Sequence, residues 1–180
     1  KFLRFKKDFL EKNKENSIIK EMWSIISSKN ISEKIVLDLF DGVESDLQTK
    51  VHLNSKKDLL LYSYRVAGTV GLMMSKILHV KDREALKGAI DLGIAMQLTN
   101  IARDVIEDKK SNREYIKSKF SSIQETINYS EIFYEKSFNS ISKIPLRSRF
   151  SVIVARRVYR KIGDYILKQK NIENYYKAGK

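Results

Sequence analysis

The chain has 180 residues, of which 42% are hydrophobic and 32% are charged, and its formal net charge is +13. This length fits a single domain over residues 1–180 with a sizeable apolar core, and no apolar run approaches the roughly 20 residues that a membrane-spanning helix needs. The absence of cysteine excludes a disulfide scaffold, a thiolate metal site and a cysteine nucleophile.

The basic charge would attract a nucleic acid, an anionic membrane face or a phosphorylated small molecule. The lysines are dispersed among glutamates along predicted helices, which favours a solvated lysine-rich surface as the simpler explanation. No run of basic residues mixed with aromatic residues is typical of a nucleic-acid interface, so we expect no nucleic-acid partner. The lack of cysteine fits a reducing compartment and favours a cytoplasmic location.

One proline and seven glycines supply little turn chemistry, while apolar residues recur at spacings of three and four. The chain is therefore predicted to be all-α. We expect seven helices, near residues 2–14, 16–28, 32–50, 56–78, 82–109, 126–142 and 146–169. The polar stretch 110–125 is predicted to be a loop. Ser32 and Ser55 suit helix N-caps, and Pro145 suits a first helical turn.

The helix predicted over residues 56–78 has one mostly apolar face with a phenol near its start. This face carries Leu59, Tyr62, Val66, Thr69, Val70, Met73 and Ile77. Gly68 and Gly71 lie within the same helix, where each costs about 1 kcal/mol of propensity relative to alanine. Either another backbone packs closely there, which is the favoured interpretation, or a ligand chain passes where side chains would block it.

The helix predicted over residues 82–109 has no formal charge from Leu92 to Ala102, which indicates a central helix enclosed by neighbours. A polar row follows it at steps of three, four and four residues, which one helical face accommodates. The row consists of Gln97, Asn100, Asp104 and Asp108. Because an apolar stripe that includes Ile94 and Leu98 adjoins this row, we expect the polar side chains to line a cavity.

The two aspartates of this row lie near the C-terminus of the helix, where the macrodipole disfavours further negative charge. Something positive should therefore offset Asp104 and Asp108. Arg103, Lys109 and Lys110 are one set of candidates, and a hard divalent ion such as Mg²⁺, which prefers carboxylate oxygens, is the other. The spacing alone leaves these two interpretations open.

Two segments, Tyr62–Met73 and Gln97–Asp108, resemble the two signature segments of squalene/phytoene synthases in residues, order and separation. The upstream Asp41–Leu47 and the downstream Asn112–Tyr115 look like that family too, so the resemblance covers essentially the whole chain. It implies an isoprenoid-synthase-type helical bundle around a central cavity. Such enzymes hold two prenyl diphosphates and join them head to head through a cyclopropyl intermediate, with magnesium bridging carboxylates and diphosphates.

The resemblance implies roles for individual residues. Asp104 and Asp108, with Asn100 beside them, would bind Mg²⁺ or in its place Mn²⁺, and Tyr62 would be catalytic with the two aspartates and face the reacting carbons. The substrate would be bound by Gln97, Asn100, Arg103, Val66, Ala67, Gly71, Arg113, Tyr115 and Tyr159. An apolar channel shaped by Val66, Val70 and Met73 would keep water from a carbocation.

The family also carries an earlier aspartate-rich motif, typically two aspartates four residues apart near an arginine. It would lie on a helix before Lys1, and Asp38 and Asp41 do not replace it because they align with another part of the family pattern. We therefore expect the chain to be the C-terminal portion of the family domain without its N-terminal helices. It is expected to act as a prenyltransferase if the missing part supplies this motif.

Three functions follow from the resemblance. The first is formation of phytoene from two geranylgeranyl diphosphates in carotenoid biosynthesis. The second is formation of squalene or dehydrosqualene from farnesyl diphosphate, with NADPH needed only for squalene. The third is a non-catalytic relative that serves as an assembly or interaction scaffold. The basic charge and the greasy substrates also suggest peripheral membrane contact, while no pattern in the sequence indicates an oligomeric state.

Overall fold

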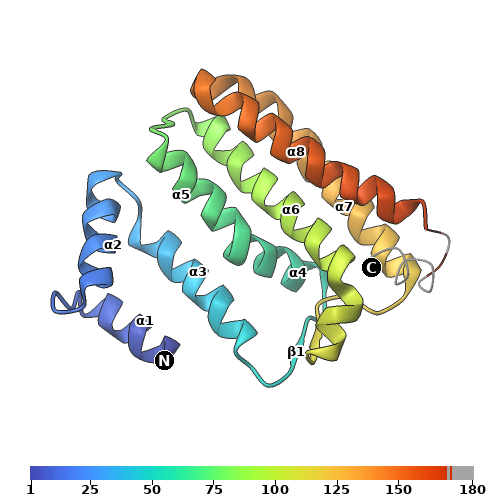
Figure 1. Cartoon of the computed structure of the whole chain (residues 1–180), viewed down its shortest axis with the longest axis horizontal. Helices are drawn as coiled ribbons and strands as arrows, with labels where there is room; N and C mark the ends of the chain where they lie inside the picture. Colours follow the sequence, from blue (N-terminus) through green and yellow to red (C-terminus); the bar gives the residue numbers. More distant parts are fainter. Residues whose placement is uncertain (170, 172–180) are drawn as a thin grey trace.

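The computed structural model of the chain describes residues 1–169 and 171 (Figure 1). Its α-helices are α1 (Phe2–Leu10), α2 (Ser17–Ser28), α3 (Glu33–Asp46), α4 (Lys56–Ser63), α5 (Thr69–Ile77), α6 (Arg83–Lys110), α7 (Phe120–Phe138) and α8 (Leu146–Leu167). A π-helical turn (Tyr64–Gly68) joins α4 to α5, and a 3-10 turn (Asn139–Lys143) follows α7. The prediction of an all-α fold is confirmed, apart from the short parallel pair β1 (Val51–His52) and β2 (Arg113–Glu114).

Helix α6 lies in the middle of the molecule, as predicted. It contacts α4, the π turn, α5, α7 and α8 (Figure 1). Its apolar stripe is buried, with Leu98 fully enclosed and Ile94 and Ile101 nearly so. Of the helices that the structure describes, none is long and apolar enough to cross a membrane.

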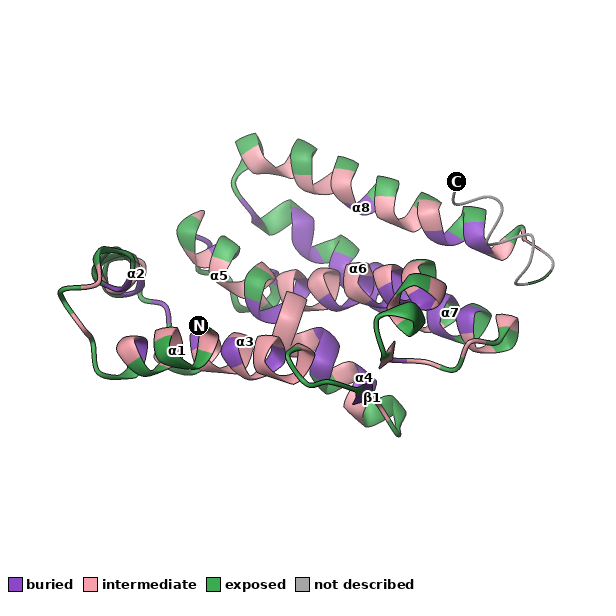
Figure 2. Cartoon of the chain, turned by 60° about the horizontal axis from the view of Figure 1, so that its bottom comes forward, coloured by how far each residue is buried: buried purple, intermediate pink, exposed green. Residues whose placement is uncertain are grey.

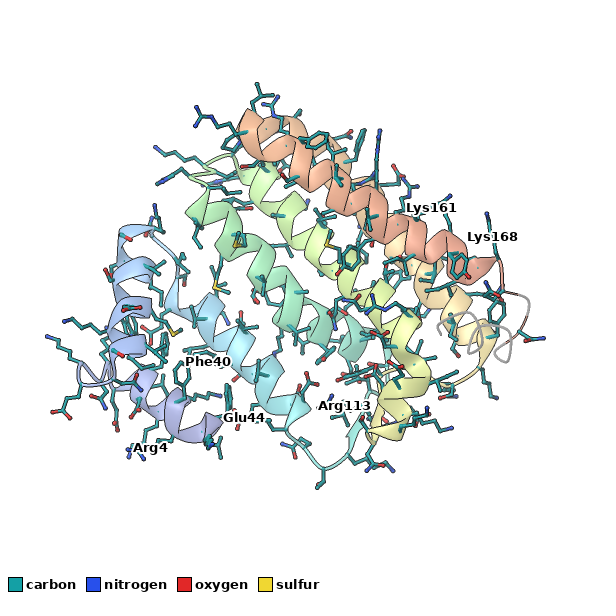
Figure 3. The ribbon with its side chains drawn as sticks, in the orientation of Figure 1. Arg4, Phe40, Glu44, Arg113, Lys161 and Lys168 are labelled. Carbon is teal, nitrogen blue, oxygen red and sulfur yellow. The ribbon has the colours of Figure 1, made fainter. Side chains whose placement is uncertain are left out.

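Helices α1 and α2 pack on α3 through an aromatic cluster, and Phe40 marks its place on α3 in Figure 3. Phe9 is fully buried, stacks on Trp23 at 4.9 Å and meets Phe40 edge to face at 5.0 Å. The indole nitrogen of Trp23 donates to the carbonyl of Phe9 at 3.1 Å. Helix α1 ends at Leu10 and not at residue 14 as predicted, because Lys12 takes a left-handed backbone conformation (φ 52°). The backbone N–H groups of Lys12 and Asn13 turn back to the carbonyls of Phe9 and Asp8.

Other predicted boundaries also differ from the structure. Helix α7 begins at Phe120 and not at residue 126, because Ile123 is fully buried against α6 and stabilises an extra turn. The loop between α6 and α7 is correspondingly shorter than the predicted 110–125. At α4 the predicted cap is confirmed, since the hydroxyl of Ser55 accepts from the backbone N–H of Asp58 at 3.1 Å.

Helices α5 and α6 approach each other closely through glycine. A methyl group at Gly71 would overlap the carbonyl oxygen of Ala89, and one at Gly93 would overlap that of Ala67. The favoured interpretation of the helical glycines, close packing of another backbone, is therefore correct for Gly71. Its propensity cost is offset by the contact between two helices that no larger residue would allow.

The π turn at Tyr64–Gly68 is the main departure from the continuous helix predicted over residues 56–78. A π turn inserts one residue relative to an α-helix, so the face that follows is displaced by one position. Val70 lines a cavity as predicted, but its companions are Met74 and Leu78. The prediction that Met73 shapes this channel was wrong, because Met73 packs against the aromatic cluster of α1–α3.

Candidate active site

A polar pocket of about 250 Å³ lies beside the C-terminal half of α6. Residues from α3, α4, α6 and the segment around β2 line it, namely Asp46, Tyr62, Gln97, Asn100, Ile101, Arg103, Asp104, Asp108, Arg113 and Tyr115. The whole polar row predicted on α6 thus faces one hollow that it shares with Tyr62. Arg113 of β2 also lines this pocket, and its label in Figure 3 stands between the end of α3 and the C-terminal part of α6.

An apolar cavity of about 360 Å³ lies between α5, α6 and α8, with the 3-10 turn at one end. In Figure 2, α8 lies apart from the layer that contains α5 and α6, and side chains of all three helices line the cavity. Six predicted substrate residues are among them: Val66, Ala67, Gly71, Gln97, Asn100 and Tyr159. Gln97 and Asn100 line both the apolar cavity and the polar pocket, so the two hollows meet at these side chains.

Two stacked tyrosines share one carboxylate at the wall of the polar pocket. The hydroxyl of Tyr62 donates to Oδ2 of Asp46 at 2.8 Å, and that of Tyr115 donates to Oδ1 at 2.7 Å. The rings are 4.7 Å apart and nearly parallel. Burial, with the hydrogen-bonded Asp46 adding to it, raises the pKa of both phenols above the ordinary value of 10.0.

Asp46 was not among the predicted site residues, although it lies in the segment Asp41–Leu47 that resembles the family. It is the last residue of α3, and its partners follow 16 and 69 positions later in the sequence. No helical spacing links such distant positions. An acidic side chain at a helix C-terminus, where negative charge is disfavoured, is a signal that could have found it, but the predicted helix ran to residue 50 whereas α3 ends at Asp46.

The two aspartates of α6 have different surroundings. Arg103 forms a two-point ion pair with Asp104, with Nε to Oδ1 at 2.7 Å and Nη2 to Oδ2 at 2.6 Å. Burial, followed by repulsion from Asp104, raises the pKa of Asp108 to about 6, while Arg113 acts in the opposite direction. Arg103 therefore offsets part of the negative charge, and the surroundings still disfavour ionised Asp108.

The pocket offers oxygen ligands suited to a hard cation. Oδ1 of Asn100 is buried and has no hydrogen-bond partner in the described part of the chain, a state that costs about 1–3 kcal/mol when nothing compensates it. It lines the same pocket as Asp104 and Asp108. Mg²⁺ is usually bound by one or two carboxylates together with waters and substrate phosphates, so this set of side chains fits it.

The described residues contain no group of three or more His, Cys, Asp or Glu side chains placed to hold a metal ion. The carboxylates of Asp104 and Asp108 would therefore need ligands from elsewhere, such as a diphosphate. Each oxygen of Asp46 already accepts a hydrogen bond from a phenol. The assignment of Mg²⁺ to Asp104, Asp108 and Asn100 stays a prediction.

An all-helical bundle with a carboxylate-lined pocket next to an apolar cavity defines a class of proteins suited to molecules with an anionic head and a greasy tail. The model of the squalene/phytoene synthase family matches residues 4–116, and the chain belongs to this family.

Phytoene synthases are among the chain's curated relatives. The 15-cis-phytoene synthase of a Paracoccus species is 34% identical over 150 residues, which cover 73% of this chain and 49% of that protein. The 15-cis-phytoene synthase of Pantoea ananas is 31% identical over 160 residues, covering 77% of this chain and 52% of the relative. The chain thus spans about half the length of the curated relatives that it matches.

Solved structures support the same fold. A crystal structure of a dehydrosqualene synthase in complex with ligand superposes with a TM-score of 0.72 at 23% identity, covering 98% of this chain and 78% of that one. A squalene synthase from Alicyclobacillus acidocaldarius superposes with a TM-score of 0.72 at 15% identity, covering 84% of this chain and 65% of that one. The prediction of an isoprenoid-synthase-type helical fold is confirmed.

Proposed function

We propose that the protein containing this chain is a Mg²⁺-dependent prenyltransferase that joins two geranylgeranyl diphosphates head to head, through a cyclopropyl intermediate, to give phytoene. The observation that carries the proposal is the junction at Gln97 and Asn100, which line both the polar pocket and the apolar cavity. A molecule spanning this junction has its charged end among carboxylates and arginines and its tail among apolar side chains. The relatives named phytoene synthase support the choice of product.

The polar pocket supplies groups that would bind and orient a diphosphate. Arg103 and Arg113 are planar, permanently charged donors that suit phosphate oxygens. Asp104, Asp108 and Asn100 would hold Mg²⁺, whose chemistry when bound is to neutralise charge that develops on the diphosphate leaving group. The chain's own part is thus to position the diphosphate and to surround it with fixed charges.

The apolar cavity would accept the prenyl tail and exclude water. Its volume of about 360 Å³ lies within the range of roughly 300–1,000 Å³ that is usual for ligand pockets. Gly71 lets α5 lie close against α6, and Val66, Ala67, Met74 and Tyr159 line the cavity with apolar or aromatic side chains. An allylic carbocation formed beside Tyr62 would then be shielded from bulk water.

Three further features belong to the proposal. The protein would act in the cytoplasm with peripheral contact to a membrane, where its apolar substrates and products collect, and its basic charge would favour an anionic surface. Mn²⁺ would also support activity in place of Mg²⁺, since both ions prefer oxygen ligands. The first aspartate-rich motif would be needed for a complete site, and NADPH would be required only if the product were squalene.

The test is to express the protein from its complete natural coding sequence and to incubate it with Mg²⁺ and either geranylgeranyl or farnesyl diphosphate. Phytoene from geranylgeranyl diphosphate, identified by mass spectrometry, would support the proposal, and its formation should be lost in Asp104→Asn. Asp164→Asn, on the exposed face of α8, is the matched control and should retain activity. A C30 hydrocarbon formed from farnesyl diphosphate would mean that farnesyl, and not geranylgeranyl, diphosphate is the substrate. If neither diphosphate gave a condensed product, a non-catalytic role as an assembly or interaction scaffold would be favoured.

A further inference from the structure

Asp46 is the last residue of α3, where a negative charge is unfavourable unless other interactions offset it. The last turn of α3 contains Glu44 and Asp46 and no basic residue, although the negative end of the helix dipole disfavours carboxylates there. Glu44 forms an ion pair with Lys6 of α1 at 2.6 Å and is labelled beside α1 in Figure 3. Asp46 instead faces the polar pocket with its carboxylate.

The carboxylate of Asp46 is occupied on both oxygens by phenols from two other parts of the chain. Tyr62 comes from α4 and Tyr115 follows β2, and each is 7% exposed. Their hydrogen bonds to the carboxylate are 2.8 and 2.7 Å long, the ordinary length of an O–H···O hydrogen bond. Arg113, two residues before Tyr115, reaches the backbone carbonyl of Asp46 at 3.4 Å. The end of α3, α4 and the segment around β2 therefore meet at one wall of the pocket.

This arrangement directs both phenolic protons away from the pocket. A phenol has one proton to donate, and Asp46 accepts the proton of Tyr62 on one oxygen and that of Tyr115 on the other. The hydroxyl of Tyr62 has a second acceptor, because the oxygen of Tyr115 lies 3.1 Å from it. Whichever of the two accepts its proton, both phenolic protons stay among these three residues, and only lone pairs remain for any molecule in the pocket. The rise in the pKa of both phenols, caused first by burial, keeps them protonated in neutral solution.

We propose that Asp46 is a positioning residue, which holds the hydroxyls of Tyr62 and Tyr115 with both protons committed to its carboxylate, so that the phenols present only lone pairs to the reacting carbons. This inference rests on the proposed function. Oxygen lone pairs fixed in advance stabilise positive charge on a prenyl group without donating a proton to it. Without the carboxylate, each hydroxyl would be free to turn its proton toward the pocket.

The kinetic test uses Asp46→Asn in the protein expressed from its complete coding sequence, with Glu44→Gln on the same helix as the control. Asp46→Asn should lower kcat by about tenfold or more with KM changed by less than about threefold, and Asp46→Glu, which keeps two acceptor oxygens, should retain more activity. In a Tyr62→Phe, Tyr115→Phe background the same change should cost less than about threefold. An equal loss in both backgrounds would overturn the proposal, because Asp46 would then act independently of the phenols.

A second measurement does not depend on turnover. With tyrosine labelled by ¹³C at Cζ, the NMR signals of Tyr62 and Tyr115 are assigned from the two Tyr→Phe variants. Both signals should move in Asp46→Asn and stay in place in Glu44→Gln, and unchanged signals in Asp46→Asn would contradict the shared hydrogen bonds. If the parent protein forms no condensed product, the proposed function fails while these signals still decide whether Asp46 fixes the two hydroxyls.

Discussion

Asp108 lies one helical turn after Asp104 on α6, and the charge of Asp104 adds to burial in raising the pKa of Asp108 to about 6. A raised carboxyl pKa means that the folded protein disfavours the ionised form. A cation bound between these side chains would remove that penalty. Cation affinity, pH and stability are therefore linked at Asp108.

The first prediction concerns the pH dependence of binding. Because the pKa of Asp108 is about 6, only about a tenth of this carboxyl is ionised at pH 5. Mg²⁺-dependent binding of a non-hydrolysable prenyl diphosphate should therefore weaken by about tenfold between pH 7 and pH 5, as measured by calorimetry. In Asp108→Asn the remaining binding should lose this component of the pH dependence. The same pH profile in both proteins would show that Asp108 is not the titrating group.

The second prediction concerns stability without a cation. The folded pKa of Asp108 is raised, so between about pH 4 and pH 6 the folded state binds more protons than the unfolded state, and the free energy of unfolding falls as pH rises through this window. At pH 7 Asp108→Asn should therefore raise the free energy of unfolding, by about 1 kcal/mol once solvent screening of a half-exposed group is allowed for. Urea unfolding measures this change. Asp164→Asn, in an exposed position, should alter stability by less than about 0.5 kcal/mol.

The third prediction concerns the contact between α5 and α6. A methyl group at Gly71 would overlap the carbonyl oxygen of Ala89, whereas one at Gly163 would meet only side-chain methyl groups of Ile127, with Cγ2 at 3.2 Å and Cδ1 at 3.7 Å. Backbone atoms of a packed helix move less readily than a side-chain methyl group. Gly71→Ala should therefore lower the free energy of unfolding by about 1–3 kcal/mol, measured by urea unfolding. Gly163→Ala should cost less, and a reversed order would contradict the close approach of the two helices.

The residues of the candidate site differ in how far sequence could locate them. Gln97, Asn100, Asp104 and Asp108 lie on a single regular helix, so the 3.6-residue period is sufficient to place them on one face. Arg113 and Tyr115 were reached only through the resemblance to a family. Asp46 was missed, because its link to Tyr62 and Tyr115 exists only once three separate segments have folded together.

The π turn limited the prediction in another way. Periodicity assumes an uninterrupted α-helix from residue 56 to 78, and no residue type within Tyr64–Gly68 indicates an inserted position. The predicted face is therefore misplaced after the π turn. Met74 lines the cavity where Met73 was predicted, and Met73 packs against the aromatic cluster. The pairing of β1 with β2 was also beyond sequence analysis, because strands of two residues are too short to produce an alternating pattern.

The fourth prediction concerns tail length. The apolar cavity follows α6 from Asn100 back to Ala85, a distance of about 22 Å at 1.5 Å per residue. Leu78 lines the cavity near the end that is far from the carboxylates, since it follows α5 where α6 is about to begin. A larger side chain there would shorten the space for a long tail and leave the diphosphate pocket unchanged.

Leu78→Trp should therefore lower kcat/KM for geranylgeranyl diphosphate by about tenfold or more, and that for the shorter farnesyl diphosphate by less than about threefold. Ile77→Trp is the matched control, because Ile77 is the preceding residue, is 38% exposed and does not line the cavity. Competition assays with both diphosphates would measure the ratio directly. Equal losses for the two substrates in Leu78→Trp would mean that the tail does not reach this end of the cavity, and the apolar cavity would then lose its place in the proposed mechanism.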